Sequence, residues 1–272
     1  MKKNLLVFPV LAGLLTACGG GSEKKEESLT LGYNLSQPVK RYALPPDLEE
    51  ISGLSYFKEN QLLCVQDEKA VAYVFDLQKE QVTDSSVFGG YGDYEGVELV
   101  GEDIFALKSN GDLFRFKPFS KEIARIPTGV PGKIEVEGLG YDPQTKRLLL
   151  AVKEGIRKDQ KVVYMYDLAT KVFWNGLTIK GDVLKQAGVD AAKFRPSGIA
   201  VHPKTGDFYF LSANERLLLV MNRKGAITAK ATLDSKLFRQ PEGICFAPDG
   251  TLYIASEGDG QAGYILSFAK QP

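Results

Sequence analysis

The chain has 272 residues, and 44% of them are hydrophobic, which is enough to bury a substantial core. Its 34 basic residues balance its 34 acidic residues. This balance gives no overall field that would attract a polyanion, so we expect no nucleic-acid partner. Any binding site must therefore come from a local arrangement of side chains.

Residues 1–17 predict a bacterial lipoprotein signal peptide. Lys2 and Lys3 form a basic start, and the apolar stretch 5–15 is too short to span a bilayer comfortably. The stretch ends in Leu15-Thr16-Ala17-Cys18, which resembles a lipobox. Cys18 would then be lipidated, palmitate included, and become the mature N-terminus. The alternative is an ordinary secretory peptide with a chance cysteine.

Residues 18–28 contain almost no apolar side chain and predict a flexible tether. Gly19 rather than aspartate follows Cys18, which favours the outer membrane by resemblance to lipoprotein sorting in enteric bacteria. We therefore expect residues 29–272 to form a domain that a lipid on Cys18 holds to a membrane of the bacterial cell envelope.

Five similar hairpin segments make up most of this domain. In each, a polar residue and a glycine precede an apolar run, a turn, a second apolar run and a polar end. The segments are ISGLSYFKENQLLCVQDE from Ile51, YEGVELVGEDIFALKSNG from Tyr94, VEGLGYDPQTKRLLLAVKEG from Val136, PSGIAVHPKTGDFYFLSANE from Pro196 and PEGICFAPDGTLYIASEG from Pro241.

The glycines of these segments recur about 42 to 45 residues apart, with one interval of about 60. They are Gly53, Gly96, Gly138, Gly198 and Gly243. This period, with four short strands in each unit, is typical of a β-propeller blade. In the second unit the strands are expected at Gly96–Val100, Asp103–Lys108, Leu113–Lys117 and Ile123–Pro127, with Asn110-Gly111 as a tight turn.

The last unit lacks a fourth strand, because the chain ends soon after the expected strand Tyr264–Phe268. The stretch Val39–Leu44, just before the first unit, can supply the missing strand and close the ring. We therefore predict an all-β, five-bladed propeller of four-stranded blades, with six blades as the less favoured alternative. The long interval contains an insertion, Gly181–Phe194, which breaks the strand pattern and predicts a loop or a short helix.

In a propeller the start of each innermost strand and the end of its neighbour lie at the same end of the central channel. The residues before the five glycines are Ser52, Glu95, Glu137, Ser197 and Glu242. Polar ends of the neighbouring strands include Asp67, Lys108, Lys153, Glu154 and Glu257. The sequence thus predicts that these polar residues meet at one mouth of the channel.

Glu95, Glu137 and Glu242 would face one another there and repel. A hard divalent cation removes this repulsion, and Ca²⁺ accepts oxygen ligands in flexible geometry. We expect these three glutamates to bind Ca²⁺, with Mg²⁺ less favoured. Alternatively, each glutamate bonds backbone N–H groups or pairs with Lys108, Lys153 or Arg195.

The motifs EISGLSY, LLCVQDE, EGLGYDPQTKRLLLAVKE, PSGIAVHP and PEGICFAPDGTLYIASEGD resemble the SdiA-regulated family of bacterial propellers. The resemblance covers about residues 39–268. It implies a secreted or membrane-anchored β-propeller with no firmly assigned activity. More distantly, the chain is similar to esterase-like phytases and to calcium-dependent lactonase propellers, whose metal lies in the central channel.

His202 is the one histidine, and it lies at the opposite end of its strand from the acidic mouth. We expect a turn residue there, and no His–His dyad, Ser–His–Asp triad or histidine-rich zinc site. Cys64 and Cys245 both lie in apolar runs, which favours free buried thiols over a disulfide or a metal pair.

Two functions remain open. In the first, the mouth binds a small-molecule or protein ligand through Ser52, Asp67, Lys108, Lys153, Arg195 and Ser197, beside a structural Ca²⁺. In the second, the chain is a Ca²⁺-dependent hydrolase of a phosphate ester or lactone, with Glu154 or Glu257 as the base. A propeller fold hosts both classes and does not decide between them.

Overall fold

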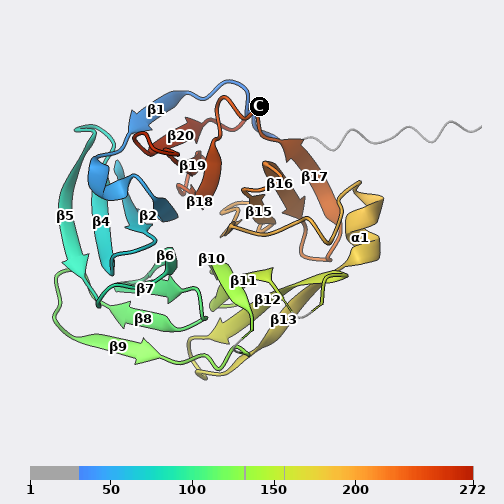
Figure 1. Cartoon of the computed structure of the whole chain (residues 1–272), viewed down its shortest axis with the longest axis horizontal. Coiled ribbons are helices and arrows are strands. Elements are labelled where there is room, and N and C mark those ends of the chain that lie inside the picture. Colours follow the sequence, from blue (N-terminus) through green and yellow to red (C-terminus); the bar gives the residue numbers. More distant parts are fainter. Residues whose placement is uncertain (1–30, 132, 156, 272) are drawn as a thin grey trace, which may run out of the picture.

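Five four-stranded antiparallel sheets stand in a ring around a central axis (Figure 1). The structure is a computed structural model that describes residues 31–131, 133–155 and 157–271. The prediction of a five-bladed propeller is confirmed. The predicted signal peptide, Cys18 and the tether lie outside the described residues.

Each blade runs outward from the axis in chain order. Blade 1 contains β2 (Ile51–Lys58), β3 (Gln61–Gln66), β4 (Val71–Asp76) and β5 (Gln81–Val87). Blade 2 contains β6 (Tyr94–Val100), β7 (Asp103–Lys108), β8 (Leu113–Phe116) and β9 (Ile123–Ile126). Blade 3 contains β10 (Glu135–Asp142), β11 (Arg147–Glu154), β12 (Gln160–Asp167) and β13 (Phe173–Lys180).

Blade 4 contains β14 (Gly198–Val201), β15 (Phe208–Ser212), β16 (Leu217–Met221) and β17 (Ile227–Thr232). Blade 5 contains β18 (Gln240–Phe246), β19 (Leu252–Glu257) and β20 (Tyr264–Phe268), with β1 (Lys40–Ala43) as its outer strand. The second-unit strands expected from the sequence agree with blade 2 to within two residues at each end.

The N-terminal strand closes the ring, as predicted. Lys40 pairs with Ser267 and Ala43 with Tyr264 in an antiparallel ladder. Hydrogen bonds from the N–H groups of Val39 and Leu44 extend this pairing to the whole predicted stretch, with distances of 2.8 Å each. The outer edge of β20 is thereby covered by a strand of the same chain, which removes an exposed edge and ties the two ends of the domain together.

The core is divided into five apolar clusters, one between each pair of neighbouring blades. Between blades 1 and 2, for example, Leu63, Val65 and Phe88 pack against Tyr94 and Phe116. The second strands of the blades read as almost continuous apolar runs because both of their faces are covered. Each blade is therefore stable only with its neighbours in place.

The five motif glycines lie where the innermost strands approach most closely. A Cβ on Gly53 would lie 2.6 Å from the Cα of Gly96, and one on Gly96 would lie 2.7 Å from the Cβ of Leu139. A Cβ on Gly198 would lie 2.5 Å from the carbonyl oxygen of Glu242. These positions exclude any side chain, which is the physical reason for the repeated glycine.

The insertion forms α1 (Gly181–Gln186) and a following loop at the outer edge of the ring (Figure 1). Leu184, Val189 and Phe194 are buried in the cluster between blades 3 and 4. The insertion therefore thickens one inter-blade core. In the part of the chain that the structure describes, no helix has both the length and the apolar character to cross a bilayer.

Cys64 and Cys245 are free and buried, as the sequence predicted. Both belong to the cluster between blades 5 and 1. Burial raises the pKa of each thiol far above its ordinary value, so both remain protonated at neutral pH and behave as small apolar side chains.

Gly53→Ala should destabilise the domain by about 1–3 kcal/mol, because the added methyl group meets the backbone of blade 2. Chemical denaturation followed by circular dichroism measures this loss. Gly90→Ala is the matched control, since a Cβ at that position meets no heavy atom within 4 Å. Equal unfolding free energies for the two variants would contradict the role given to the glycine ring.

Candidate functional site

β-Bulges interrupt four of the five innermost strands near the same end. The pairing with the neighbouring strand shifts between Ile51 and Gly53, between Tyr94 and Gly96, between Val136 and Gly138, and between Pro241 and Ile244. The residues left out of the regular pairing include Ser52, Glu95, Glu137 and Glu242. A bulge re-aims the side chain that it carries, so these four polar residues turn from the blade faces toward the mouth of the channel.

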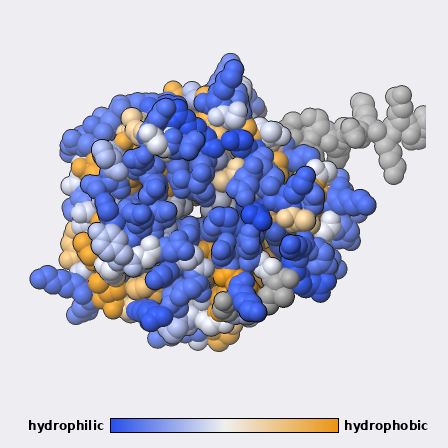
Figure 2. Space-filling model, in the orientation of Figure 1, coloured by the Kyte–Doolittle hydropathy of each residue, from blue (hydrophilic) through white to orange (hydrophobic). Residues whose placement is uncertain are grey.

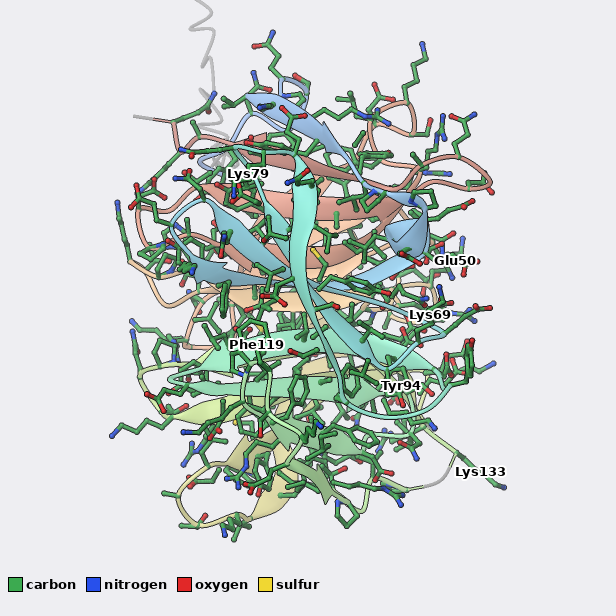
Figure 3. The ribbon with its side chains drawn as sticks, turned by 90° about the vertical axis from the view of Figure 1, so that its left-hand side faces the viewer. Glu50, Lys69, Lys79, Tyr94, Phe119 and Lys133 are labelled. Atoms are coloured by element: carbon green, nitrogen blue, oxygen red, sulfur yellow. The ribbon has the colours of Figure 1, made fainter. Side chains whose placement is uncertain are left out.

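This mouth is a cavity of about 290 Å³ lined by seven carboxylates and one ammonium group. Glu50, Lys69 and Lys133 mark the face on which it opens, at the right-hand side of Figure 3. Figure 2 looks onto the same face and shows hydrophilic residues around the centre of the ring. The lining residues are Ser52, Asp67, Asp93, Glu95, Ser109, Glu135, Glu137, Lys153, Gln240, Glu242 and Glu257.

The channel closes directly below the glutamates. At the level of the glycine ring the open space shrinks to about 10 Å³. Leu54, Leu139, Ile199 and Ile244, each next to a motif glycine, line this constriction. The mouth is therefore a blind pocket with an apolar floor, which deprives the lowest carboxylates of water.

This burial shifts the ionisation of the three central glutamates. Desolvation, followed by the charges of Glu137 and Asp93, raises the pKa of Glu95 to about 9. Desolvation and the charge of Glu137 also raise the pKa of Glu242 well above its ordinary value. Glu137 is buried as well, and its pKa is raised by desolvation, although its contact with the Lys153 ammonium acts against this shift.

Two further carboxylates of the mouth also have raised pKa values. Desolvation and the neighbouring charge of Asp67 raise the pKa of Glu257 to about 7. Desolvation and Glu50 raise the pKa of Asp67 to about 6. Its Oδ1 is buried and has no hydrogen-bond partner in the described part of the chain. The mouth thus holds carboxylates that lack the donors or cations needed to stabilise their charged forms.

The structure brings together seven of the residues that the sequence predicted for the site, namely Ser52, Asp67, Glu95, Glu137, Lys153, Glu242 and Glu257. Two predicted serines have another task. The Ser52 hydroxyl donates a 2.6 Å hydrogen bond to the Tyr94 carbonyl, and the Ser197 hydroxyl donates a 2.9 Å bond to the Pro241 carbonyl. Each bond joins one blade to the next, so these hydroxyl protons are already engaged.

Four predicted residues lie outside the lining of the mouth, and one of them, Ser197, lines the constriction below it. Glu154 and Arg195 form an ion pair of 2.8 Å in which both side chains are about half exposed. Lys108 places its ammonium 5.9 Å from the centre of the Tyr94 ring. The alternative anticipated from the sequence, in which a glutamate pairs with a nearby lysine, is found for Glu137 and Lys153.

Asp93, Glu135 and Gln240 line the mouth but were not predicted. Each stands three residues before a motif glycine, in DYEG, EVEG and QPEG. Glu50 and Arg195 occupy the same position in the other two units. A repeated polar residue at this spacing was therefore the available signal. Ser109, at the strand end that the sequence placed at the mouth, also lines it and donates a 2.5 Å hydrogen bond to Asp93.

His202 is a turn residue on the opposite face, as expected. Its Nδ1 accepts hydrogen bonds from the N–H groups of Lys204 and Thr205, and its Nε2 contacts the Tyr33 hydroxyl at 3.1 Å. The Tyr33 hydroxyl donates to the Gly250 carbonyl, so Nε2 carries the proton. Burial and nearby Lys270 lower the pKa of His202 and keep it neutral.

The profile of the SdiA-regulated family matches residues 38–259 of the chain. The chain belongs to the SdiA-regulated family. The resemblance seen in the hairpin motifs is thereby confirmed, and the matched stretch contains all three central glutamates. No curated protein matches the sequence significantly.

Several solved enzymes share the propeller fold. A glutaminyl cyclase from Myxococcus xanthus has a TM-score of 0.62 and 12% identity, over 86% of this chain and 95% of that one. A luciferin-regenerating enzyme has a TM-score of 0.55 and 10% identity, over 86% and 95%. A PQQ-bound aldose sugar dehydrogenase from Streptomyces coelicolor has a TM-score of 0.53 and 13% identity, over 85% and 97%. At these identities the likeness shows the fold alone.

Glu95→Gln should stabilise the domain more at pH 8 than at pH 5. The pKa of Glu95 rises from its ordinary value of 4.5 to about 9 on folding, so the folded state binds a proton that the unfolded state releases. Stability is therefore lost as the pH rises between these values. Because glutamine cannot ionise, the variant lacks this loss, and its gain in unfolding free energy over the parent should be about 4 kcal/mol larger at pH 8 than at pH 5, as measured by urea denaturation.

The control is Glu122→Gln, which changes an exposed glutamate remote from the mouth. We expect this variant to unfold like the parent protein at both pH values. A Glu95→Gln variant that gains no stability between pH 5 and pH 8 would contradict the buried, uncompensated carboxylate described above.

Proposed function

We propose that the domain is a ligand-binding propeller whose acidic mouth takes up a divalent cation, Ca²⁺ in preference to Mg²⁺. One observation supports this proposal above the others: seven carboxylates and a single ammonium group line one blind pocket. A folded chain that keeps so many carboxylates against an apolar floor loses stability at neutral pH. A bound cation would restore that stability by supplying the missing positive charge.

The donor chemistry fits a hard cation, since the lining offers carboxylate, hydroxyl and amide oxygens and no sulfur or imidazole. The spacing is more open than a closed metal site. Among the residues that the structure describes, no three His, Cys, Asp or Glu side chains are grouped closely enough to hold an ion. We therefore propose that Glu95, Glu137 and Glu242 turn toward Ca²⁺ as it binds, and that Glu137 exchanges Lys153 for the ion.

Lys153 gives the site a second function in this proposal. Its ammonium group lies beside Glu137, inside the same cavity. Once the cation has bound the glutamates, Lys153 and the cation together would attract an anionic group of a ligand or partner. Asp67 and Gln240 at the wall of the mouth would then accept or donate hydrogen bonds to the rest of that molecule.

We further propose that Cys18 anchors this domain to the bacterial outer membrane, after removal of residues 1–17. The sequence of the lipobox and the low apolar content of residues 18–28 support this arrangement. Metabolic labelling with an alkyne analogue of palmitate tests it directly. Label on the parent protein and none on Cys18→Ala is the expected result, and equal labelling or an unlabelled parent would overturn it.

A hydrolase at the same mouth is the second candidate. The raised pKa of Glu257 favours this function over a purely structural ion. Desolvation and Asp67 raise the pKa of this carboxyl to about 7, where it can exchange a proton near neutral pH. Glu154, the other base predicted from sequence, is paired with Arg195 outside the mouth, so Glu257 is the base that we propose. The substrate would be a phosphate ester or a lactone.

Isothermal titration with Ca²⁺ should show one site with a dissociation constant of about 0.1–1 mM at pH 8, weakening at pH 5 because protons compete for the glutamates. The Glu95→Gln, Glu137→Gln double variant should lose this binding, whereas Glu122→Gln should keep it. Absence of binding to the parent protein, or unchanged binding to the double variant, would overturn the proposal.

A panel of phosphate esters and lactones, assayed with Ca²⁺ and with a chelator, separates the two functions. Turnover that stops with the chelator and in Glu257→Gln would establish the hydrolase. Ca²⁺ binding without turnover of any member of the panel would leave ligand binding as the function of the mouth.

A further inference from the structure

Blades 2 and 3 differ in the length of their outer strands. β8 and β9 contain four residues each, whereas β12 and β13 contain eight each. The shorter strands of blade 2 cannot cover the whole facing surface of blade 3. Several apolar side chains at this interface, including Ile126, Val162, Tyr164 and Phe173, are only partly buried.

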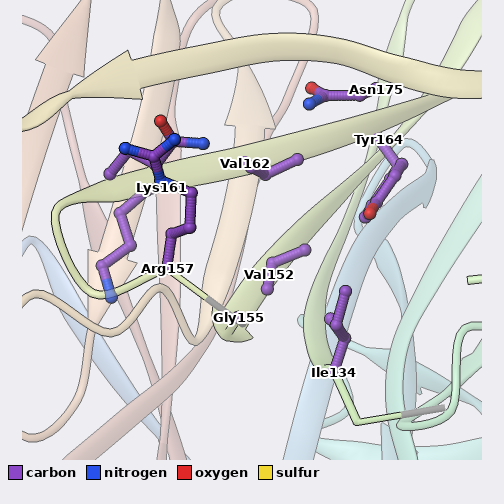
Figure 4. A pocket seen from close by; sticks show the side chains of 9 residues that line it. Ile134, Val152, Gly155, Arg157, Lys161, Val162, Tyr164 and Asn175 are labelled. Atoms are coloured by element: carbon purple, nitrogen blue, oxygen red, sulfur yellow. The ribbon is translucent and has the colours of Figure 1, made fainter. Parts of the chain in front are cut away.

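Two cavities border the apolar cluster between these blades. The smaller one has a volume of about 170 Å³, and Ile134, Val152, Val162 and Tyr164 surround it (Figure 4). The larger one has a volume of about 470 Å³, which is within the usual range for a small-molecule site. The ring of Tyr164 stacks on Phe173 at 4.9 Å, so these two residues separate the cavities.

The larger cavity, which we call the blade 2–3 cleft, combines aromatic walls with positive charge. Its lining includes Phe105, Tyr166 and Phe173, together with Arg115, Arg125 and Lys171. No acidic side chain lines it. Arg125 is held by Asp112 at 2.6 Å, but Arg115 and Lys171 form no ion pair with any residue that the structure describes.

Tyr166 gives a second, independent indication of a ligand. Its side chain is 6% exposed, and its hydroxyl forms no hydrogen bond within the described part of the chain. The hydroxyl oxygen itself keeps contact with solvent, which reaches it through the cleft. Because Tyr166 lines the cleft, a molecule that enters it can supply the missing partner.

We propose that the blade 2–3 cleft binds a small aromatic anion, with its ring between the aromatic walls and its charged group between Arg115 and Lys171. A planar guanidinium group matches a carboxylate in a two-bond geometry. The Tyr166 hydroxyl donates to the same carboxylate. This site is separate from the acidic mouth, with which it shares no lining residue, and does not depend on the function proposed there.

The test is isothermal titration of the whole protein with 2-naphthoate, and with uncharged 2-naphthamide as the matched ligand. We expect 2-naphthoate to bind one site with a dissociation constant below about 1 mM, and 2-naphthamide to bind about tenfold more weakly or not at all. Equal affinities, or no binding of 2-naphthoate, would overturn the proposal.

Substitutions of residues that line the cleft test whether 2-naphthoate binds there. Arg115→Gln and Lys171→Gln should each weaken 2-naphthoate binding about tenfold, whereas Lys224→Gln, an exposed lysine on blade 4, should not. Tyr166→Phe should weaken binding without lowering the melting temperature, because it removes a hydroxyl that has no partner in the free protein. Binding that survives both cation substitutions would overturn the assignment to this cleft.

Discussion

The close approach of the five innermost strands is the constraint on which the rest of the structure depends. At Gly53, Gly96 and Gly198 the next blade comes so near that a single methyl group would meet its backbone or the first atom of a side chain. Five blades can surround such a narrow axis only with glycine at these positions. The same constriction lets Leu54, Leu139, Ile199 and Ile244 close the channel and convert it into a blind pocket.

The bulges beside these glycines connect the fold to its candidate site. A bulge adds one residue that the ladder does not pair, and the chain places a polar residue there in four blades. Glu95, Glu137 and Glu242 consequently line the same mouth above an apolar floor. The architecture that stabilises the ring thus creates a group of carboxylates that destabilises it, and such an arrangement is typical of a functional site.

Departures from five-fold symmetry give the domain its individual features. Blades 1 and 4 have a serine in place of glutamate before the glycine, and the Ser52 and Ser197 hydroxyls join them to blades 2 and 5. The insertion after β13 fills the core between blades 3 and 4. The short outer strands of blade 2 leave the neighbouring inter-blade space open and lined by cations and aromatic rings. Each departure changes one interface between blades and leaves the ring intact.

The sequence by itself determined the number of blades, the closing strand before the first unit, the free thiols and the meeting of three glutamates at one mouth. These features follow from a repeat period, turn residues and strand alternation, all of which are local along the chain. Only the tertiary structure decided which partners the polar residues take. Lys153 contacts Glu137, Glu154 pairs with Arg195, and Ser52 bonds the Tyr94 carbonyl. These contacts depend on the bulges and on the way that neighbouring blades pack, and neither is encoded in the spacing of the repeat.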